Sequence, residues 1–407
     1  MVTPALIVGP ASLRSRVGWA GRAARALTTL VSASVLAAGA LAVVPAPARA
    51  EDVITTQEYF SYYHLDTARA KGYTGKGVTI ALIDGPVDTS APELKGANIT
   101  DKSRCTIEAS SKNKGHGFDM ASILVSPNFG VAPDAALYSY QVSTANSISA
   151  GTCEKDGEKL DTYARLINQA IDDGAQIISI SQGSGDDSEE LKWAVTRAMS
   201  EGVIIVNSAG NTAADANSDQ LSHWSGVVGV SAITADGTFA DYSSWGNGVT
   251  TAAFGGPVRT RDDSDPTKLA VSKGTSNSAA IVSGLLALAR QKWPDATANQ
   301  LLQVLTQTAL NPNHEWNPYT GYGPIDGGAL VNTDPSQYPD ENPLAQKEGG
   351  SKPTVADVQD YGDGLVDPRY VSAGDSYTYR GVDPIVLDDR DIATPVHLGT
   401  SPRYHRK

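Results

Sequence analysis

Short apolar runs alternate with amphipathic segments from Val78 to about Leu330. The apolar runs predict strands at residues 78–83, 136–142, 176–181, 203–207 and 227–233. Between and after them, a helical spacing predicts helices at residues 116–125, 160–173, 188–200, 276–293 and 298–308. Pro294 ends the fourth of these helices. Because nearly continuous apolar strands separated by helices are typical of a parallel sheet, the pattern predicts an α/β fold with helices on both faces of the sheet.

The two ends of the chain differ in composition from this central part. Four arginines precede an apolar stretch from about Leu27 to Val44, and small residues follow as far as Ala50. This order predicts a secretory signal peptide over residues 1–50, and the alternative is an uncleaved N-terminal membrane anchor. We then expect an N-terminal extension at 51–77, the main domain at 78–334, and a linker with a partly ordered tail at 335–407. No second apolar run approaches spanning length, so we expect a secreted or extracytoplasmic protein of the cell envelope.

The net charge of the chain narrows the classes of binding partner, and its two cysteines predict a disulfide. The chain has 32 basic and 45 acidic residues, and removing the five arginines of the signal leaves 27 basic residues and a formal net charge of −18. Such a negative charge disfavours a nucleic-acid partner. Cys105 and Cys153 are the only cysteines, and in an oxidising compartment they are predicted to form a disulfide. Two free thiols or half of a metal site are the alternatives.

Ser276 is the first candidate for chemistry. It opens the predicted helix 276–293 directly after Gly274 and Thr275. The first turn of a helix has unpaired N–H groups and the positive end of the helix dipole, which suit an oxyanion that forms beside this hydroxyl. An N-cap serine on a buried helix is the alternative. A nucleophilic serine would also need a base and an orienting carboxylate elsewhere in the chain.

Three residues at the ends of other elements could supply these groups. Asp84 ends the first predicted strand, and ligand crevices form at the carboxyl ends of parallel strands. His116 stands between two glycines, which leave room for its ring to turn outward. Asn211 follows the fourth predicted strand and could donate to an oxyanion beside the Ser276 N–H. For each there is a structural alternative: a turn for Asp84 and Asn211, and a structural histidine for His116.

Together these segments resemble the subtilisin-like serine peptidases, over roughly residues 66–332. The order Asp84, His116, Ser276 is that of the family's triad, and the segments 130–135, 178–183 and 321–326 are also similar. The resemblance implies that Ser276 attacks the scissile carbonyl, that His116 is general base and then acid, and that Asp84 orients it. It implies that Asn211 helps bind the oxyanion. It also implies two cleft walls that pair with extended substrate, formed by Ser181, Gln182 and Gly183 and by Ser208, Ala209 and Gly210.

The chain departs from the family pattern beside two of these residues and before the domain. Gly85 follows Asp84 where Thr or Ser is usual, and Asn277 follows Ser276 where Met is usual. Only 27 residues separate Ala50 from Val78, too few for the inhibitory prodomain of many secreted members. In this respect the chain resembles the mycosin branch, which serves type VII secretion in actinobacteria. Mycosins, however, carry a C-terminal membrane helix, and the tail here has no apolar run that predicts one.

The sequence therefore predicts a secreted serine endopeptidase that hydrolyses peptide bonds through an acyl-enzyme. The short N-terminal extension and the unusual neighbours of Ser276 favour restricted processing over broad degradation. The alternative is a non-catalytic subtilisin-like domain that binds peptides or serves as an envelope scaffold. No cofactor is predicted, and no metal, because the acidic loop with Asp262, Asp263 and Asp265 fits no recognised calcium loop. The expected partners are protein or peptide substrates, with a secretion-system partner left open.

Overall fold

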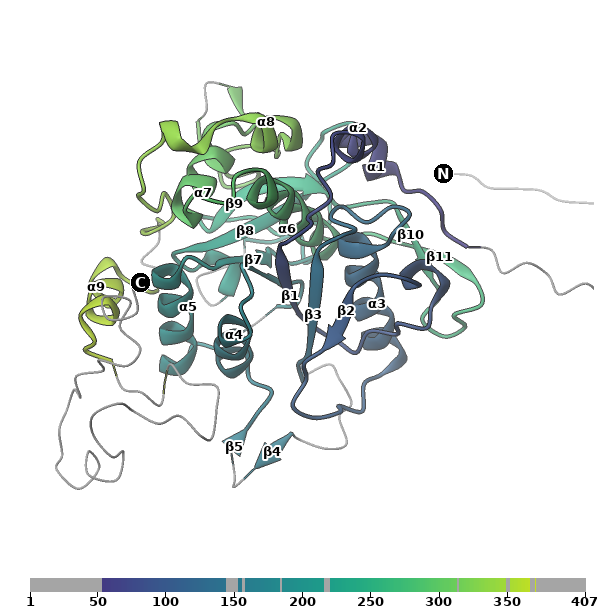
Figure 1. Cartoon of the computed structure of the whole chain (residues 1–407), viewed down its shortest axis with the longest axis horizontal. Helices are drawn as coiled ribbons and strands as arrows, with labels where there is room; N and C mark the ends of the chain where they lie inside the picture. Colours follow the sequence, from purple (N-terminus) through teal and green to yellow (C-terminus); the bar gives the residue numbers. More distant parts are fainter. Residues whose placement is uncertain are drawn as a thin grey trace, which may run out of the picture. The chain divides into compact units, whose positions relative to one another are not determined.

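Seven parallel strands form the central sheet of the computed structural model, in the order β2-β3-β1-β6-β7-β8-β9 (Figure 1). The structure describes residues 53–143, 153–155, 158–183, 185–215, 220–312, 315–348, 352–366 and 370. The predicted signal peptide and residues 371–407 lie outside the described residues. The strands of the sheet are β1 (Thr79–Asp84), β2 (Ile99–Asp101), β3 (Ala136–Gln141), β6 (Ile177–Ile180), β7 (Ile204–Ser208), β8 (Val227–Ile233) and β9 (Val249–Phe254).

Helices pack on both faces of this sheet. On one face, α3 (Ser111–Val125) and α6 (Thr275–Lys292) share a core with Ile80 and Leu82 of β1. On the other, α4 (Tyr163–Asp172) and α5 (Glu189–Glu201) share a core with Ala81 and Ile83. Successive β1 side chains thus point to opposite faces, as strand geometry requires. The predicted α/β class, a parallel sheet flanked by helices, is confirmed.

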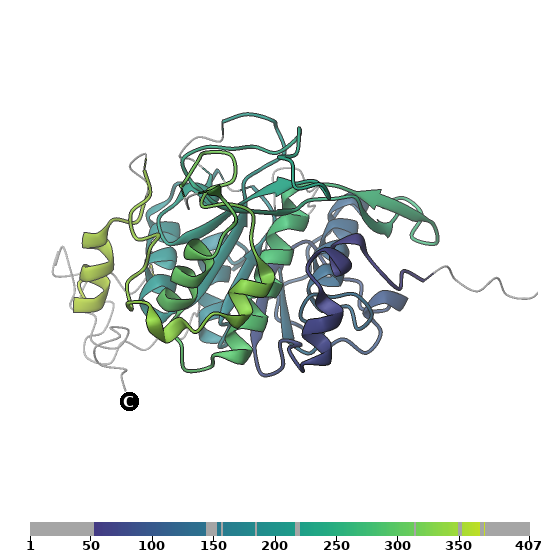
Figure 2. The ribbon, with the colours of Figure 1, turned by 90° about the horizontal axis from the view of Figure 1, so that it is seen from above.

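The remaining elements lie around these layers. The short helices are α1 (Glu58–Tyr62), α2 (Leu65–Ala70), α7 (Ala298–Gln307), α8 (Gly327–Asn332), α9 (Val355–Asp363), η1 (Pro92–Leu94), η2 (Leu221–His223) and η4 (Pro335–Gln337). Two antiparallel pairs are formed by β4 (Glu154–Lys155) with β5 (Glu158–Lys159) and by β10 (Val258–Arg261) with β11 (Leu269–Ser272). Figure 2 shows the β10–β11 hairpin extending beyond the edge of the sheet.

Two of the predicted helices begin at different residues from those expected. The helix expected from His116 begins five residues earlier, at Ser111, because Ser110 caps it and its Oγ accepts the Asn113 N–H at 3.2 Å. The helix expected from Ser188 begins at Glu189, with Ser188 as the N-cap that accepts the Leu191 N–H at 3.2 Å. In both cases a serine oxygen satisfies one of the unpaired N–H groups of the first turn, which fixes the start of the helix.

The N-terminal extension is attached to the domain by polar contacts. Ile54 donates its backbone N–H to Glu93 Oε1 at 3.0 Å. Glu93 also forms a buried ion pair with Arg261 of β10, with Oε1 2.6 Å from Nη2 and Oε2 3.2 Å from Nε. Gln57 bonds to both backbone groups of Arg259, at 2.7 and 2.9 Å. The extension, η1 and the β10–β11 hairpin are therefore held together as one structural unit.

The segment from residue 335 to 366 differs from the expected linker, because much of it packs on the domain. The carbonyl of Leu344 accepts the Gly226 N–H at 2.7 Å, and Lys347 Nζ donates to the carbonyls of Ser222 and Gly248 at 3.0 and 2.7 Å. Helix α9 lies against α5, where the buried Tyr361 packs on its apolar neighbours (Figure 1). The packed domain therefore extends well beyond residue 334. No helix in the described ranges is long and apolar enough to cross a membrane.

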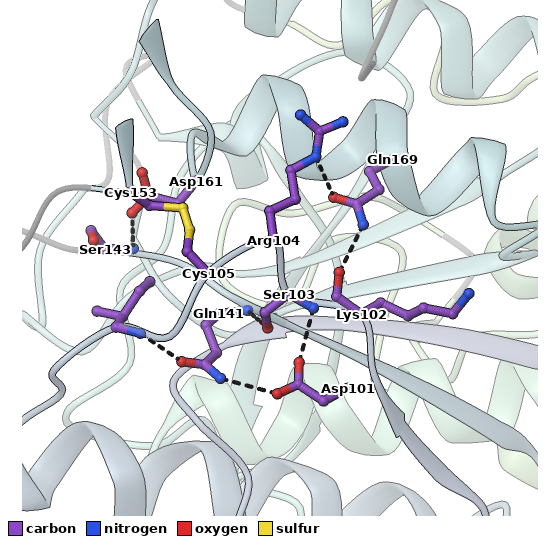
Figure 3. Close-up of a disulfide and its surroundings, with 11 residues drawn as sticks. Asp101, Lys102, Ser103, Arg104, Cys105, Gln141, Ser143, Cys153, Asp161 and Gln169 are labelled. Carbon is purple, nitrogen blue, oxygen red and sulfur yellow. Dashed lines mark hydrogen bonds between the residues drawn. A yellow bond between two sulfur atoms is a disulfide. The ribbon is translucent and has the colours of Figure 1, made fainter. Parts of the chain in front are cut away.

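The structure joins Cys105 and Cys153 in a disulfide, as predicted (Figure 3). Their Cα atoms are 5.9 Å apart and 48 residues apart in sequence. Hydrogen bonds surround the bridge: Gln141 donates to Asp101 at 3.2 Å and accepts the Ile107 N–H at 3.1 Å. In the chain-entropy model, closing a loop of this length stabilises the fold by about 4 kcal/mol.

Candidate active site

Two glycines allow helix α3 to approach the carboxyl end of β1. A Cβ atom on Gly85 would lie 2.2 Å from the Asn113 carbonyl oxygen, and one on Gly117 would lie 2.5 Å from the Gly85 carbonyl oxygen. No side chain fits at either position, so backbone meets backbone there. This close approach places His116 of α3 over Asp84, the last residue of β1.

Asp84 and His116 form the first part of the site. His116 Nδ1 lies 2.7 Å from Asp84 Oδ1, and the Gly85 N–H donates to the same oxygen at 2.7 Å. The Asp84 side chain is fully buried, while that of His116 is 29% exposed. Within the described part of the chain His116 Nε2 has no hydrogen-bond partner, so it is the nitrogen left to exchange a proton with a nucleophile. A carboxylate on Nδ1 selects the tautomer and ring orientation that this role requires.

Acidic groups around His116 shift its proton affinity. Burial lowers the pKa of His116, but the Asp84 carboxylate, with smaller contributions from Asp119 and Asp263, outweighs that effect and raises it above the usual value. Asp119 lies one helical turn further along α3 and contacts the Thr260 hydroxyl, and burial raises the pKa of Asp119 to about 8. We therefore expect the imidazole to bind its proton more tightly than an isolated histidine and to act as a base at higher pH.

Asp263 reaches the site from the tip of the β10–β11 hairpin. Its carboxylate lies against Gly115, where an added Cβ would be 1.9 Å from Oδ1. Burial and the neighbouring Asp262 raise the pKa of Asp263 above its usual value, against the smaller lowering effects of Lys112 and His116. The hairpin thus adds a negative charge to the surroundings of His116.

Ser276 is the second residue of α6, and its hydroxyl contacts the end of β6. Its Oγ donates to the Ser181 carbonyl at 2.8 Å, and Ser181 Oγ donates to the Ser276 carbonyl at 3.1 Å. The expected hydrogen bond from Ser276 to His116 is absent from the described residues. Catalytic hydrogen bonds are often long or poorly aligned before substrate binds, and rotation about χ1 alone would redirect this hydroxyl.

Asn211 is oriented by the residue that precedes the serine. Its Oδ1 accepts the Thr275 N–H at 2.8 Å and the Thr275 hydroxyl at 3.1 Å. An amide whose oxygen is an acceptor has its NH2 group left to donate. Nδ2 lies beside Gly274, 3.2 Å from the position of an added Cβ, and therefore next to the first turn of α6. This orientation suits a donor that acts together with the Ser276 N–H.

Five of the six predicted substrate-wall residues follow β6 or β7, and Ser208 is the last residue of β7. Ala209 and Gly210 already use their N–H groups, on Val230 O at 2.8 Å and Thr275 Oγ1 at 3.1 Å. Gly183 is exposed, and within the described ranges its backbone groups have no partner, so it is the wall residue best placed to pair with an extended peptide. Ser181 and Ser208 are buried.

Gln182, the remaining wall residue, has a contact that the sequence did not indicate. Its Nε2 donates to Asp84 Oδ1 at 3.0 Å, although it was predicted to line the substrate cleft. Asp119 and Asp263 were also missed. The position of Asp119 three residues after His116 on a helix was an available signal. For Gln182 and Asp263 only the tertiary structure indicates a place near the site. No cluster of three or more potential metal ligands occurs among the described residues.

The parallel sheet flanked by helices is the fold expected of a subtilisin-like serine peptidase. A sequence model of the subtilase family matches residues 75–323, which is more than half of the chain. The chain therefore belongs to the subtilase family, and it is a serine-type endopeptidase.

Individual relatives include both an alkaline protease and mycosins. A thermostable alkaline protease of Halalkalibacterium halodurans is 30% identical over 277 residues, covering 67% of this chain and 70% of the relative. Mycosin-1 of Mycolicibacterium smegmatis is 28% identical over 331 residues, covering 68% of this chain and 72% of the relative. The crystal structure of MycP1 from the ESX-1 type VII secretion system superposes with a TM-score of 0.57 at 25% identity, over 72% of this chain and 90% of that chain. These likenesses support the resemblance to the mycosin branch.

Proposed function

We propose that this subtilase hydrolyses peptide bonds with Ser276 as nucleophile, His116 as general base and acid, and Asp84 as the orienting carboxylate. The observation that carries the proposal is the 2.7 Å contact between His116 Nδ1 and the buried Asp84 carboxylate. The neighbouring residues Ser181 and Gln182 contact Ser276 and Asp84 respectively, so nucleophile and acid lie at the same end of the sheet.

In the proposed reaction, Ser276 Oγ attacks the scissile carbonyl while His116 Nε2 takes its proton. The negative charge that develops on the carbonyl oxygen is stabilised by Asn211 Nδ2 and the Ser276 N–H. His116 then gives the proton to the leaving amine, and the acyl-enzyme remains on Ser276. Water, deprotonated by His116, hydrolyses this ester and frees the enzyme.

A test of this mechanism is the pre-steady-state release of p-nitrophenol from an activated ester. We expect a burst with an amplitude close to one equivalent of enzyme, followed by slower turnover, and no burst in the Ser276→Ala variant. A non-catalytic peptide-binding domain is the rival function that this experiment tests. That rival predicts no burst in the wild-type protein.

We further propose that the enzyme acts outside the cytoplasm and cuts few sites, as a processing protease. The likeness to the mycosins supports this role, and a component of a type VII secretion system is a candidate partner class. Slow cleavage of denatured casein with discrete products would support it. Rapid and extensive digestion of casein would contradict it.

A further inference from the structure

Gln182 contacts the orienting carboxylate of the proposed triad. It stands at the carboxyl end of β6, which pairs in parallel with β1 and so lies beside Asp84. Its Nε2 is 3.0 Å from Asp84 Oδ1, the same oxygen that lies 2.7 Å from His116 Nδ1. Within the part of the chain that the structure describes, His116 and Gln182 are the two side chains that bond to this carboxylate.

The residue after Asp84 cannot supply such a side-chain donor. Gly85 contributes its backbone N–H to Oδ1 at 2.7 Å, but any Cβ there would lie 2.2 Å from the Asn113 carbonyl oxygen of α3. The close approach of α3 that brings His116 to Asp84 therefore requires glycine at position 85. The second side-chain donor comes instead from the segment that follows the adjacent strand β6, where the Gln182 side chain reaches Asp84 Oδ1.

The backbone of Gln182 is fixed from two sides. Its carbonyl accepts the Asn207 side-chain amide at 3.1 Å, and the same amide donates to Ile180 O at 2.8 Å. Asn207 is fully buried at the end of β7. On the other side, Ser181 and Ser276 exchange two hydrogen bonds. Because its backbone is held in place, the Gln182 side chain can keep the Asp84 carboxylate in one orientation at little cost in conformational entropy.

We propose that Gln182 is a positioning residue, which holds Asp84 Oδ1 toward His116 Nδ1 and so keeps the imidazole in the orientation for proton transfer from Ser276. This inference rests on the proposed function. It reassigns Gln182 from the substrate wall to the support of the triad. A hydrogen bond to an ionised carboxylate also lowers the free energy of the charged form, which is the form that orients the imidazolium.

Two substitutions test the role. Gln182→Met keeps the length of the side chain and removes the donor, and we expect kcat to fall about 10-fold, equivalent to about 1.4 kcal/mol, with KM changed less than about twofold. Gln182→Glu keeps the shape and places a second carboxylate against Asp84, so kcat is expected to fall further. In Gln182→Met the acid limb of kcat/KM moves to higher pH, because the Asp84 carboxylate keeps only His116 and the Gly85 N–H as partners and then attracts the proton of His116 more strongly.

Gln176→Met is the matched control. Gln176 Oε1 accepts the Thr79 N–H at 3.1 Å, at the opposite ends of the same two strands. We expect that variant to lose stability while its kcat and pH profile stay as in the wild type. A raised KM with unchanged kcat in Gln182→Met would show that Gln182 contacts substrate, and it would overturn the proposal.

Proton NMR of the His116 Nδ1–H resonance separates this inference from the proposed function, because it needs no turnover. We expect a strongly downfield resonance in the wild type that shifts in Gln182→Met and stays in Gln176→Met. If the wild type hydrolyses no ester but the resonance shifts, the proposed function fails and the positioning contact stands. If the wild type is active and Gln182→Met changes neither the resonance nor kcat, the positioning role is refuted.

Discussion

The buried ion pair between Glu93 and Arg261 gives a direct test of how the β10–β11 hairpin is held beside the site. Glu93 is fully buried, and Arg261 is 6% exposed. Arg261→Met removes the charged partner and leaves the carboxylate with one remaining backbone donor, the Ile54 N–H at 3.0 Å. Breaking a buried pair in this way costs about 3–5 kcal/mol, since an uncompensated charge stays in the interior.

The loss should depend on whether the partner charge is removed as well. In the double variant Glu93→Met with Arg261→Met no charge is buried, so we expect at least about 2 kcal/mol of the loss to be recovered.

Equilibrium urea unfolding followed by circular dichroism measures these differences, with Ser276→Ala in every variant to prevent self-digestion. Lys268→Met is the control on the same hairpin, since Lys268 pairs with Asp265 at the surface, where both side chains are exposed. We expect no measurable change in that control. Additive effects of the two substitutions, or a loss below about 1 kcal/mol for Arg261→Met, would refute a coupled buried pair.

Four further predictions concern the site and the bridge. Asn211→Leu removes one oxyanion donor and should lower kcat about 10²–10³-fold with little change in KM, which steady-state kinetics would show, and an unchanged kcat would exclude this role. Because the pKa of His116 is raised, kcat/KM should rise with pH through a value above about 6.5. Asp263→Asn should move that limb to lower pH, more at low salt than at high salt, and a salt-independent profile would contradict the electrostatic origin. Replacing Cys105 and Cys153 by serine should cost about 2–4 kcal/mol of unfolding free energy, and a thiol titration of the unreduced wild type that finds two free thiols would disprove the bridge.

The hydrophobic pattern predicted the strands that consist mainly of large apolar residues. The run Val227–Ile233 was predicted with both ends as observed, because its apolar residues are nearly continuous. The pattern missed β9 (Val249–Phe254), whose centre is Thr-Thr-Ala-Ala and which is a strand through its pairing with β8. It also missed β2 (Ile99–Asp101), a three-residue edge strand with polar positions. In these cases tertiary pairing decides the structure rather than local preference.

The sequence indicated those candidate site residues that lie near the end of a strand or the start of a helix. Asp84, Asn211 and Ser276 were found because each stands where a strand ends or a helix begins. The contact of Gln182 with Asp84 depends on the register of β6 against β1, which no local pattern encodes. Asp263 reaches the site through a hairpin far along the chain, and its approach depends on how that hairpin packs. The direction of the Ser276 hydroxyl is set by a rotamer, which the sequence does not specify.

Labelling with a fluorophosphonate probe, followed by peptide mapping of the adduct, tests the central claim most directly. We expect one equivalent of label on Ser276 in the wild-type protein, no label in Ser276→Ala, and strongly slowed labelling in His116→Ala. An unlabelled wild-type protein, or equal labelling of the wild type and Ser276→Ala, would contradict the assignment of Ser276 as the nucleophile.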